Sequence, residues 1–185
     1  MSAPKKYIFI DRDGVLNTTL PPYVSKWTEF VWYPWTFKAL RSLLKNGANL
    51  FLITNQSGVG RGYFSEETLQ EIFAKMKNRL NQSGLQFTDM YYCPHSPEDE
   101  CNCRKPAPGM LEDAAANYDF ELAGSWLIGD HYTDIAAGNA VGANTILVKS
   151  LRDGSEVRDQ CQPDFVVSNL LEASEIIIGK WRKAV

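Results

Sequence analysis

Short apolar runs alternate with amphipathic segments along the whole chain. Six apolar runs are typical of strands: residues 7–10, 49–54, 87–92, 125–128, 145–148 and 165–167. Five segments between them carry apolar residues at helical spacing: residues 36–44, 65–80, 108–117, 133–140 and 170–178. Ser65 is a suitable N-cap for the second of these helices, and two glutamates follow it in the first turn. Pro108 is suited to the first turn of the third helix.

This alternation predicts an α/β fold with a Rossmann-like, doubly wound parallel sheet that is covered by helices on both faces. A length of 185 residues is typical of one domain, and no repeat or long linker divides the chain. We therefore expect a single domain over residues 1–185. Ligands of such sheets bind beyond the carboxyl ends of the strands. Functional side chains are thus expected directly after each strand.

The composition is that of an ordinary globular protein, with 44% apolar and 22% charged residues. A net charge of -3 gives no general attraction to nucleic acid or to an anionic membrane. No apolar run reaches the roughly 18 residues that a membrane span needs, and the first run is too short for a signal peptide. We therefore expect a cytoplasmic protein.

Two carboxylates, Asp11 and Asp13, follow the first predicted strand. An anionic pair at a strand end can hold Mg²⁺ and present one oxygen to a phosphorus atom. One Asp can form an aspartyl-phosphate, while the other protonates the leaving oxygen and later deprotonates water. The alternative is a solvated turn, because Asp-Gly pairs are common in turns and Gly14 follows.

Polar residues also follow the next strands. The segment from Thr54 to Gly58 offers hydroxyl, amide and backbone donors for phosphate oxygens, or it is a polar loop with a cap. Lys105 can neutralise a transferring phosphoryl group, unless it is an ordinary surface lysine. Asp130 can complete the metal site that Asp11 begins, whereas Asp134 is expected to cap or brace the next helix.

Three cysteines and a histidine lie close together as Cys93, His95, Cys101 and Cys103. Without a signal peptide, such a cluster indicates metal rather than disulfides. Thiolates and imidazole suit tetrahedral Zn²⁺, and four protein ligands leave no open position, so a structural zinc is expected. The alternative is a chance cluster of free thiols. Cys161 stands apart and is expected to be a plain thiol.

The order of these groups, each after a strand, resembles the four-motif signature of the haloacid-dehalogenase-like phosphatase superfamily. The resemblance covers most of the chain and implies Asp11 as the nucleophile and Asp13 as the general acid and base. It also implies that Thr54 and Lys105 stabilise the phosphoryl group. Mg²⁺ would then be held by Asp11, Asp130 and the backbone carbonyl of Asp13.

Residues 93–106 contain CPH and then CxCRKP, and this pattern resembles the branch that holds D-glycero-D-manno-heptose 1,7-bisphosphate 7-phosphatases and histidinol-phosphate phosphatase domains. The segments NQSGVGRG (55–62) and KPAPGM (105–110) resemble the heptose enzymes, so removal of the 7-phosphate of that sugar is the expected activity. Histidinol phosphate and other small phosphorylated sugars are the alternatives. The expected substrate contacts are Tyr23, Asn55, Gln56, Arg61, Arg104 and His131.

Two departures from the heptose pattern leave the substrate and its anomer open. His131 stands where lysine is common, and a histidine can be neutral near pH 7. Pro21 and Pro22 replace the usual residues of the first loop. Arg61 either binds a second anionic group of the substrate or is a solvated loop charge.

The segment between Leu16 and Trp35 is too short for a large cap domain, so a fairly open site is expected. Its dense aromatic residues are expected to pack the first loop onto the core, although a sugar platform is an alternative. The expected partner is a small phosphorylated metabolite, with no nucleic acid and no membrane, and the protein is expected to be a monomer.

A further hypothesis is that a zinc-fixed loop orients Arg104 and Lys105 toward the phosphate.

Overall fold

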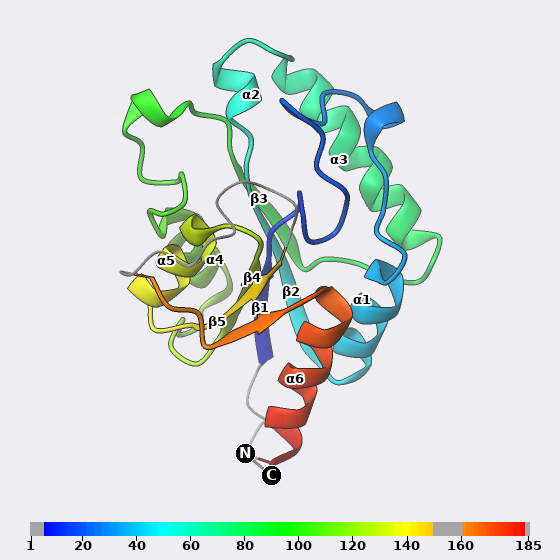
Figure 1. Cartoon of the computed structure of the whole chain (residues 1–185), viewed down its shortest axis with the longest axis vertical. Coiled ribbons are helices and arrows are strands. Elements are labelled where there is room, and N and C mark those ends of the chain that lie inside the picture. Colours follow the sequence, from blue (N-terminus) through cyan, green and yellow to red (C-terminus); the bar gives the residue numbers. More distant parts are fainter. Residues whose placement is uncertain (1–5, 150–160, 184–185) are drawn as a thin grey trace.

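The computed structural model describes residues 6–149 and 161–183. Its strands form one parallel sheet in the order β3-β2-β1-β4-β5-β6, which lies at the centre of the molecule (Figure 1). They are β1 (Lys6–Ile10), β2 (Ala48–Asn55), β3 (Asp89–Cys93), β4 (Trp126–Gly129), β5 (Asn144–Val148) and β6 (Phe165–Val167). Each predicted strand is thus present, with ends shifted by at most two residues.

The helices are α1 (Thr36–Lys45), α2 (Ser57–Gly60), α3 (Glu66–Asn81), α4 (Gly109–Tyr118), α5 (Tyr132–Ala140) and α6 (Leu170–Lys183). The five predicted helices are confirmed, and Ser65 caps α3 by accepting a hydrogen bond from the Thr68 N–H. Pro108 lies at the N-cap of α4, one position before its expected place. Helix α2 replaces part of an expected polar loop, because four residues are too few to show a helical period.

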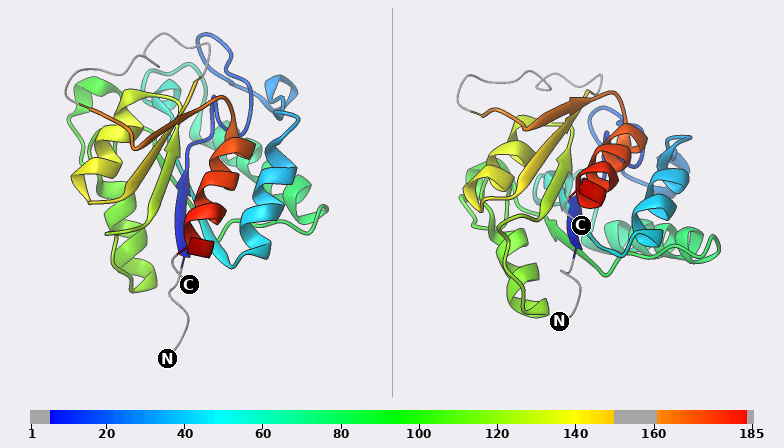
Figure 2. Two further views of the ribbon diagram at one scale, coloured as in Figure 1. Left: turned by 60° about the horizontal axis from the view of Figure 1, so that its bottom comes forward. Right: turned by 90° about the horizontal axis from the view of Figure 1, so that it is seen from below.

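The helices cover both faces of the sheet, as Figure 2 shows: α1, α3 and α6 lie on one face, and α4 and α5 on the other. Side chains of β1 alternate between the two cores. Ile8 and Ile10 pack with the first group of helices, whereas Phe9 packs with the second. All three side chains are fully buried, so the sheet is apolar on both sides, as a doubly wound sheet requires.

The connection from β1 to α1 contains a single 3₁₀ turn, Trp27–Glu29, and no inserted domain. Its aromatic residues pack onto the core as predicted: Phe30 is buried and stacks with Trp27, while Trp32 contacts both Phe30 and Phe37. The expectation that no large cap domain is inserted between Leu16 and Trp35 is therefore confirmed.

The first and last described elements meet at the end of the molecule opposite the carboxyl ends of the strands (Figure 1). The Lys6 ammonium lies 4.5 Å from the ring centre of Trp181 and donates to the carbonyl of Asn46.

Among the described residues, no helix is long and apolar enough to cross a membrane. The single domain over residues 1–185 and the monomeric state stay predictions.

Candidate active site

The carboxyl ends of the central strands open into a pocket of about 800 Å³. Asp11 follows β1, Thr54 lies near the end of β2, and Asp130 follows β4. The pocket is lined by all of the predicted catalytic, magnesium and substrate residues: Asp11, Asp13, Tyr23, Thr54, Asn55, Gln56, Arg61, Arg104, Lys105, Asp130 and His131. The fold thus brings together residues that are far apart in the chain, such as Asp11 and His131, which are 120 positions apart.

A buried lysine joins two carboxylates at the floor of this pocket. The Lys105 ammonium lies 2.8 Å from Oδ1 of Asp11 and 2.6 Å from Oδ1 of Asp134, and it donates to the carbonyl of Ile53. Burial alone lowers the pKa of Lys105, but the two carboxylates outweigh it and raise that pKa. Lys105 therefore places a fixed positive charge beside the expected nucleophile.

The carboxyl group of Asp11 is itself perturbed by the pocket. Burial raises its pKa to about 6, since the opposing attraction of Lys105 only partly compensates and Asp134 adds repulsion. The shift marks a carboxylate whose charge is poorly solvated by the protein alone. Such groups are common at functional sites, where a further cation or a reacting group completes the balance.

The carboxylate of Asp13 is surrounded by donors. Arg12 donates to both of its oxygens at 2.7–3.1 Å, Asn17 donates to Oδ1 at 2.8 Å, and Gln56 donates to Oδ2 at 3.0 Å. Burial opposes these contacts, but Arg12 and the amide donors lower the pKa of Asp13. Gln56 also donates to the Thr54 hydroxyl at 2.9 Å, which links the acid pair to β2.

Three carboxylates are arranged as a magnesium site requires. Asp11, Asp130 and Asp134 are buried, and one oxygen of each lies within 4.8 Å of the others. Hard carboxylate oxygens are the ligands that Mg²⁺ prefers. A Cβ at Gly14, where φ is +87°, would lie 1.9 Å from Oδ2 of Asp130, so only glycine leaves room for that carboxylate. These residues therefore fit Mg²⁺.

Asp134 has a wider role than the expected cap. It closes the first turn of α5 by accepting a hydrogen bond from the His131 N–H at 3.1 Å, which matches the expectation. It also pairs with Lys105 and belongs to the carboxylate cluster. Sequence reasoning placed it at the helix end and gave no signal for the lysine contact, because that contact depends on how α5 packs against the loop before α4.

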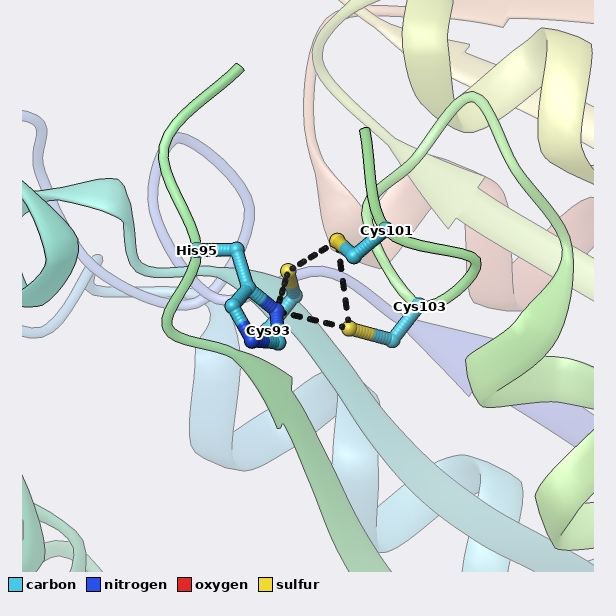
Figure 3. Close-up of side chains that lie close together, drawn as sticks. All are labelled: Cys93, His95, Cys101 and Cys103. Atoms are coloured by element: carbon cyan, nitrogen blue, oxygen red, sulfur yellow. Dashed lines mark hydrogen bonds between the residues drawn. The ribbon is translucent and has the colours of Figure 1, made fainter. Parts of the chain in front are cut away.

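The cysteine and histidine side chains converge as Figure 3 shows. The Sγ of Cys93 and that of Cys103 each lie 3.5 Å from the Sγ of Cys101, and Nδ1 of His95 lies 3.3–3.5 Å from Cys103 and Cys93. Tetrahedral zinc with bonds of about 2.3 Å separates sulfur ligands by about 3.8 Å. The four side chains therefore fit zinc with only small movements.

Hydrogen bonds to backbone groups hold the zinc-ligand segment, residues 93–103, and the neighbouring Lys105 against the pocket. The side-chain amide of Asn55 donates to the carbonyl of Lys105 and accepts from its N–H, at 2.9 and 3.1 Å. The Gly60 N–H donates to the carbonyl of Pro94, and Arg104 donates to the carbonyl of His95. The segment and Lys105 are therefore anchored to the end of β2 and to α2.

Several expected substrate residues lie near the rim of the pocket. Arg61 forms an exposed ion pair with Glu98 at 3.3 Å, and the Tyr23 hydroxyl lies 3.2 Å from Oγ of Ser57. The ring of His131 accepts from the Thr133 N–H. Cys161 is buried away from the other cysteines, as expected of a plain thiol.

Sequence reasoning missed two residues of the site, Arg12 and Asn17. Both are fully buried, and both donate to Asp13. The only signal for Arg12 was its place between the two aspartates. A motif that is defined by residue types alone does not predict that Arg12 and Asn17 contact Asp13.

Comparisons with known proteins identify the family. A family model described as HAD-hydrolase-like matches residues 102–173. The D-glycero-beta-D-manno-heptose-1,7-bisphosphate 7-phosphatase of Pseudomonas putida is 39% identical over 145 residues, covering 78% of this chain and 83% of the relative. An enzyme of the same name from Neisseria meningitidis serogroup A is 36% identical over 180 residues, covering 94% and 95%.

A solved structure is similar over nearly the whole chain. It is the D,D-heptose 1,7-bisphosphate phosphatase from B. bronchiseptica, complexed with magnesium and phosphate, with 33% sequence identity and a TM-score of 0.84. The match covers 95% of this chain and 99% of that chain. With the strand order and the carboxylate pocket, these matches show that the chain belongs to the D-glycero-D-manno-heptose-1,7-bisphosphate 7-phosphatase family of haloacid-dehalogenase-like hydrolases.

Proposed function

We propose that this protein is a Mg²⁺-dependent phosphatase that removes the 7-phosphate of D-glycero-D-manno-heptose 1,7-bisphosphate through an aspartyl-phosphate on Asp11. The observation that carries the proposal is the buried Lys105 ammonium beside Asp11, within a cluster of carboxylates at the sheet edge. The names of the relatives support the substrate, and two of them specify the β anomer.

In the first step, a carboxylate oxygen of Asp11 attacks phosphorus and the bond to the sugar oxygen breaks. Asp13 gives its proton to that leaving oxygen. Lys105 and the Thr54 hydroxyl face the phosphoryl oxygens and stabilise their charge. Bound Mg²⁺ supplies further positive charge there, and Asp11, Asp130 and the backbone carbonyl of Asp13 would hold it, with Asp134 nearby.

In the second step, the carboxylate of Asp13 takes a proton from water while the water oxygen attacks the phosphorus of the aspartyl-phosphate. The bond between phosphorus and the Asp11 oxygen then breaks, so inorganic phosphate leaves and both aspartates return to their starting states. The same residue thus serves as acid and then as base.

The rest of the substrate would extend toward the rim. Arg61 and Arg104 suit a second phosphate, because guanidinium groups bind phosphate oxygens in pairs. The ion pair of Arg61 with Glu98 is exposed and therefore weak, so a substrate phosphate can replace it. Asn55 and Gln56 direct their amides at Lys105 and Asp13, which favours a supporting role over direct substrate contact.

Phosphate release with Mg²⁺ on three compounds tests the activity: the α and β anomers of D-glycero-D-manno-heptose 1,7-bisphosphate, and histidinol phosphate. We expect kcat/KM above about 10⁴ M⁻¹s⁻¹ on the β anomer, well above the other two. Preference for histidinol phosphate would overturn the sugar assignment but keep the chemistry. Weak release from all three would overturn the substrate class.

We further propose that zinc bound by the four residues of Figure 3 fixes the loop that carries Lys105. Removing zinc with a chelator, followed by excess Mg²⁺, should raise KM or abolish turnover, because residues 93–103 otherwise have little apolar core to order them. Zinc content is measured by metal analysis, and re-addition of zinc should restore activity. Full activity in a verified zinc-free sample would refute this role.

A further inference from the structure

Arg12 is a fully buried arginine whose role the mechanism above leaves open. Its guanidinium carbon lies 6.0 Å from the ring centre of Phe30 and 5.8 Å from that of Phe73, so two aromatic side chains enclose it. A charge in such surroundings is stable only with a partner that satisfies its hydrogen bonds. The partner therefore indicates what the arginine does.

That partner is the carboxylate of Asp13. Nε and Nη2 of Arg12 lie 3.1 and 2.7 Å from Oδ2, and Nη2 also lies 3.0 Å from Oδ1. Asn17 and Gln56 each donate to one oxygen only. The planar guanidinium contacts both oxygens from one rigid group and so fixes the plane of the carboxylate, whereas Asn17 and Gln56 reach both oxygens only jointly.

The number of donors also matters for proton transfer. A carboxylate offers about four lone-pair sites, and the three side chains already use them. A leaving oxygen that exchanges a proton with Asp13 must therefore replace one of these donors. The Gln56 amide makes one contact with Asp13, at 3.0 Å, so it can give way while the three contacts of Arg12 keep the carboxylate oriented.

We propose that Arg12 is a positioning residue, which holds the carboxylate of Asp13 in the plane needed to pass a proton to the leaving oxygen. This inference rests on the proposed function, because it assumes that Asp13 is the acid. Arg12 itself touches neither the substrate nor the transferred phosphoryl group in this scheme. Its loss should therefore damage proton transfer selectively, and leave the attack by Asp11 comparatively intact.

Two substrates separate these effects. An alkyl phosphate, such as the sugar bisphosphate, needs a proton on its leaving oxygen, whereas 4-nitrophenyl phosphate releases a stable phenolate without one. The parameter kcat/KM reports only steps up to formation of the aspartyl-phosphate, so the later water step does not obscure the comparison. The measured quantity is the loss on the alkyl phosphate divided by the loss on the aryl phosphate.

The variants are Arg12→Met, which removes the guanidinium but fills similar space, and Arg12→Lys, which keeps the charge without the planar fork. Asp13→Asn sets the ratio for complete loss of the acid. General acid catalysis is typically worth about 10²–10⁴-fold, so we expect a ratio of at least about 30 for Arg12→Met and a smaller selective loss for Arg12→Lys.

Leu43→Ala serves as a control for general destabilisation, because Leu43 is fully buried in the core on α1 and does not line the pocket. It should lower the thermal midpoint and affect both substrates equally. Equal losses on both substrates in the Arg12 variants, with a selective loss in Asp13→Asn, would overturn the positioning role alone. Equal losses in Asp13→Asn as well would overturn the acid role of Asp13 together with this inference.

Discussion

Lys105 shows how single residues depend on one another in this pocket. Its ammonium balances Asp11, directly after β1, and Asp134 on α5, and Asn55 holds its backbone from β2. A lysine that is pinned on all sides cannot follow the substrate, so it acts as a preorganised charge. Preorganisation of this kind avoids rearrangement at the moment of phosphoryl transfer.

Replacement of the nucleophile tests the centre of the mechanism. We expect Asp11→Asn to lower kcat at least about 10³-fold, because an amide cannot form the aspartyl-phosphate. The fold should be kept, since the side chains have nearly the same shape and the buried Lys105 keeps Asp134 as its partner. Phosphate release and circular dichroism measure the two effects. Asp113→Asn, an exposed change on α4, is the matched control, and retained activity in Asp11→Asn would refute the assignment.

The sequence predicted the residues that motifs place directly after strands, such as Asp11, Asp13 and Lys105, and the structure brings them into one pocket. It did not predict the contacts of Arg12 and Asn17, because the surroundings of Arg12 depend on Phe30, in the connection between β1 and α1, and on Phe73 of α3. The positions of these residues were available in the sequence, but their partners were not.

At the scale of elements, the zinc-ligand segment and α2 are packed unusually closely. Gly60 lies against the segment so tightly that a Cβ there would come within 2.8 Å of the Pro94 carbonyl and 2.9 Å of the Ser96 nitrogen. Both are backbone atoms and cannot move aside cheaply. The short helix α2 thus acts as a support for the loop.

Gly60→Ala tests this support. We expect a loss of about 1–3 kcal/mol in the free energy of unfolding, because overpacking forces the two backbones apart. Zinc affinity should fall as well. Denaturant unfolding and competition with a coloured chelator measure the two quantities.

The matched control is Gly179→Ala on α6, where an added Cβ meets nothing within 4 Å. It should be neutral or stabilise the protein by up to about 1 kcal/mol, because alanine favours a helix interior. If Gly60→Ala behaves like Gly179→Ala, α2 does not support the loop.

For the whole molecule, the alternation of strands and helices was enough to predict a doubly wound sheet and a site at its carboxyl edge. The strand order was not readable from the pattern, because apolar runs such as those of β1 and β4 look alike. The order decides which loops become neighbours. It places Asp11 and Asp130 side by side, since β1 and β4 are paired.

The contact between Lys6 and Trp181 predicts that the chain tolerates circular permutation. Joining Lys183 to Lys6 by a short linker and opening the exposed turn at Gly84 should leave kcat/KM within about threefold, because both changes lie far from the pocket. Opening the chain between Glu98 and Asp99 is the matched control. That site is equally exposed but belongs to the zinc-ligand segment, so activity should be lost. Loss of activity in both permutants would contradict the prediction.

The short connection between β1 and α1 has a kinetic consequence. Many enzymes enclose their substrate under a moving domain, and the opening of that domain then limits turnover. Here the same stretch of chain is already packed against the core by its aromatic residues. This connection therefore holds no domain that must move for substrate entry or phosphate departure, and we expect the chemical step rather than a domain opening to limit turnover.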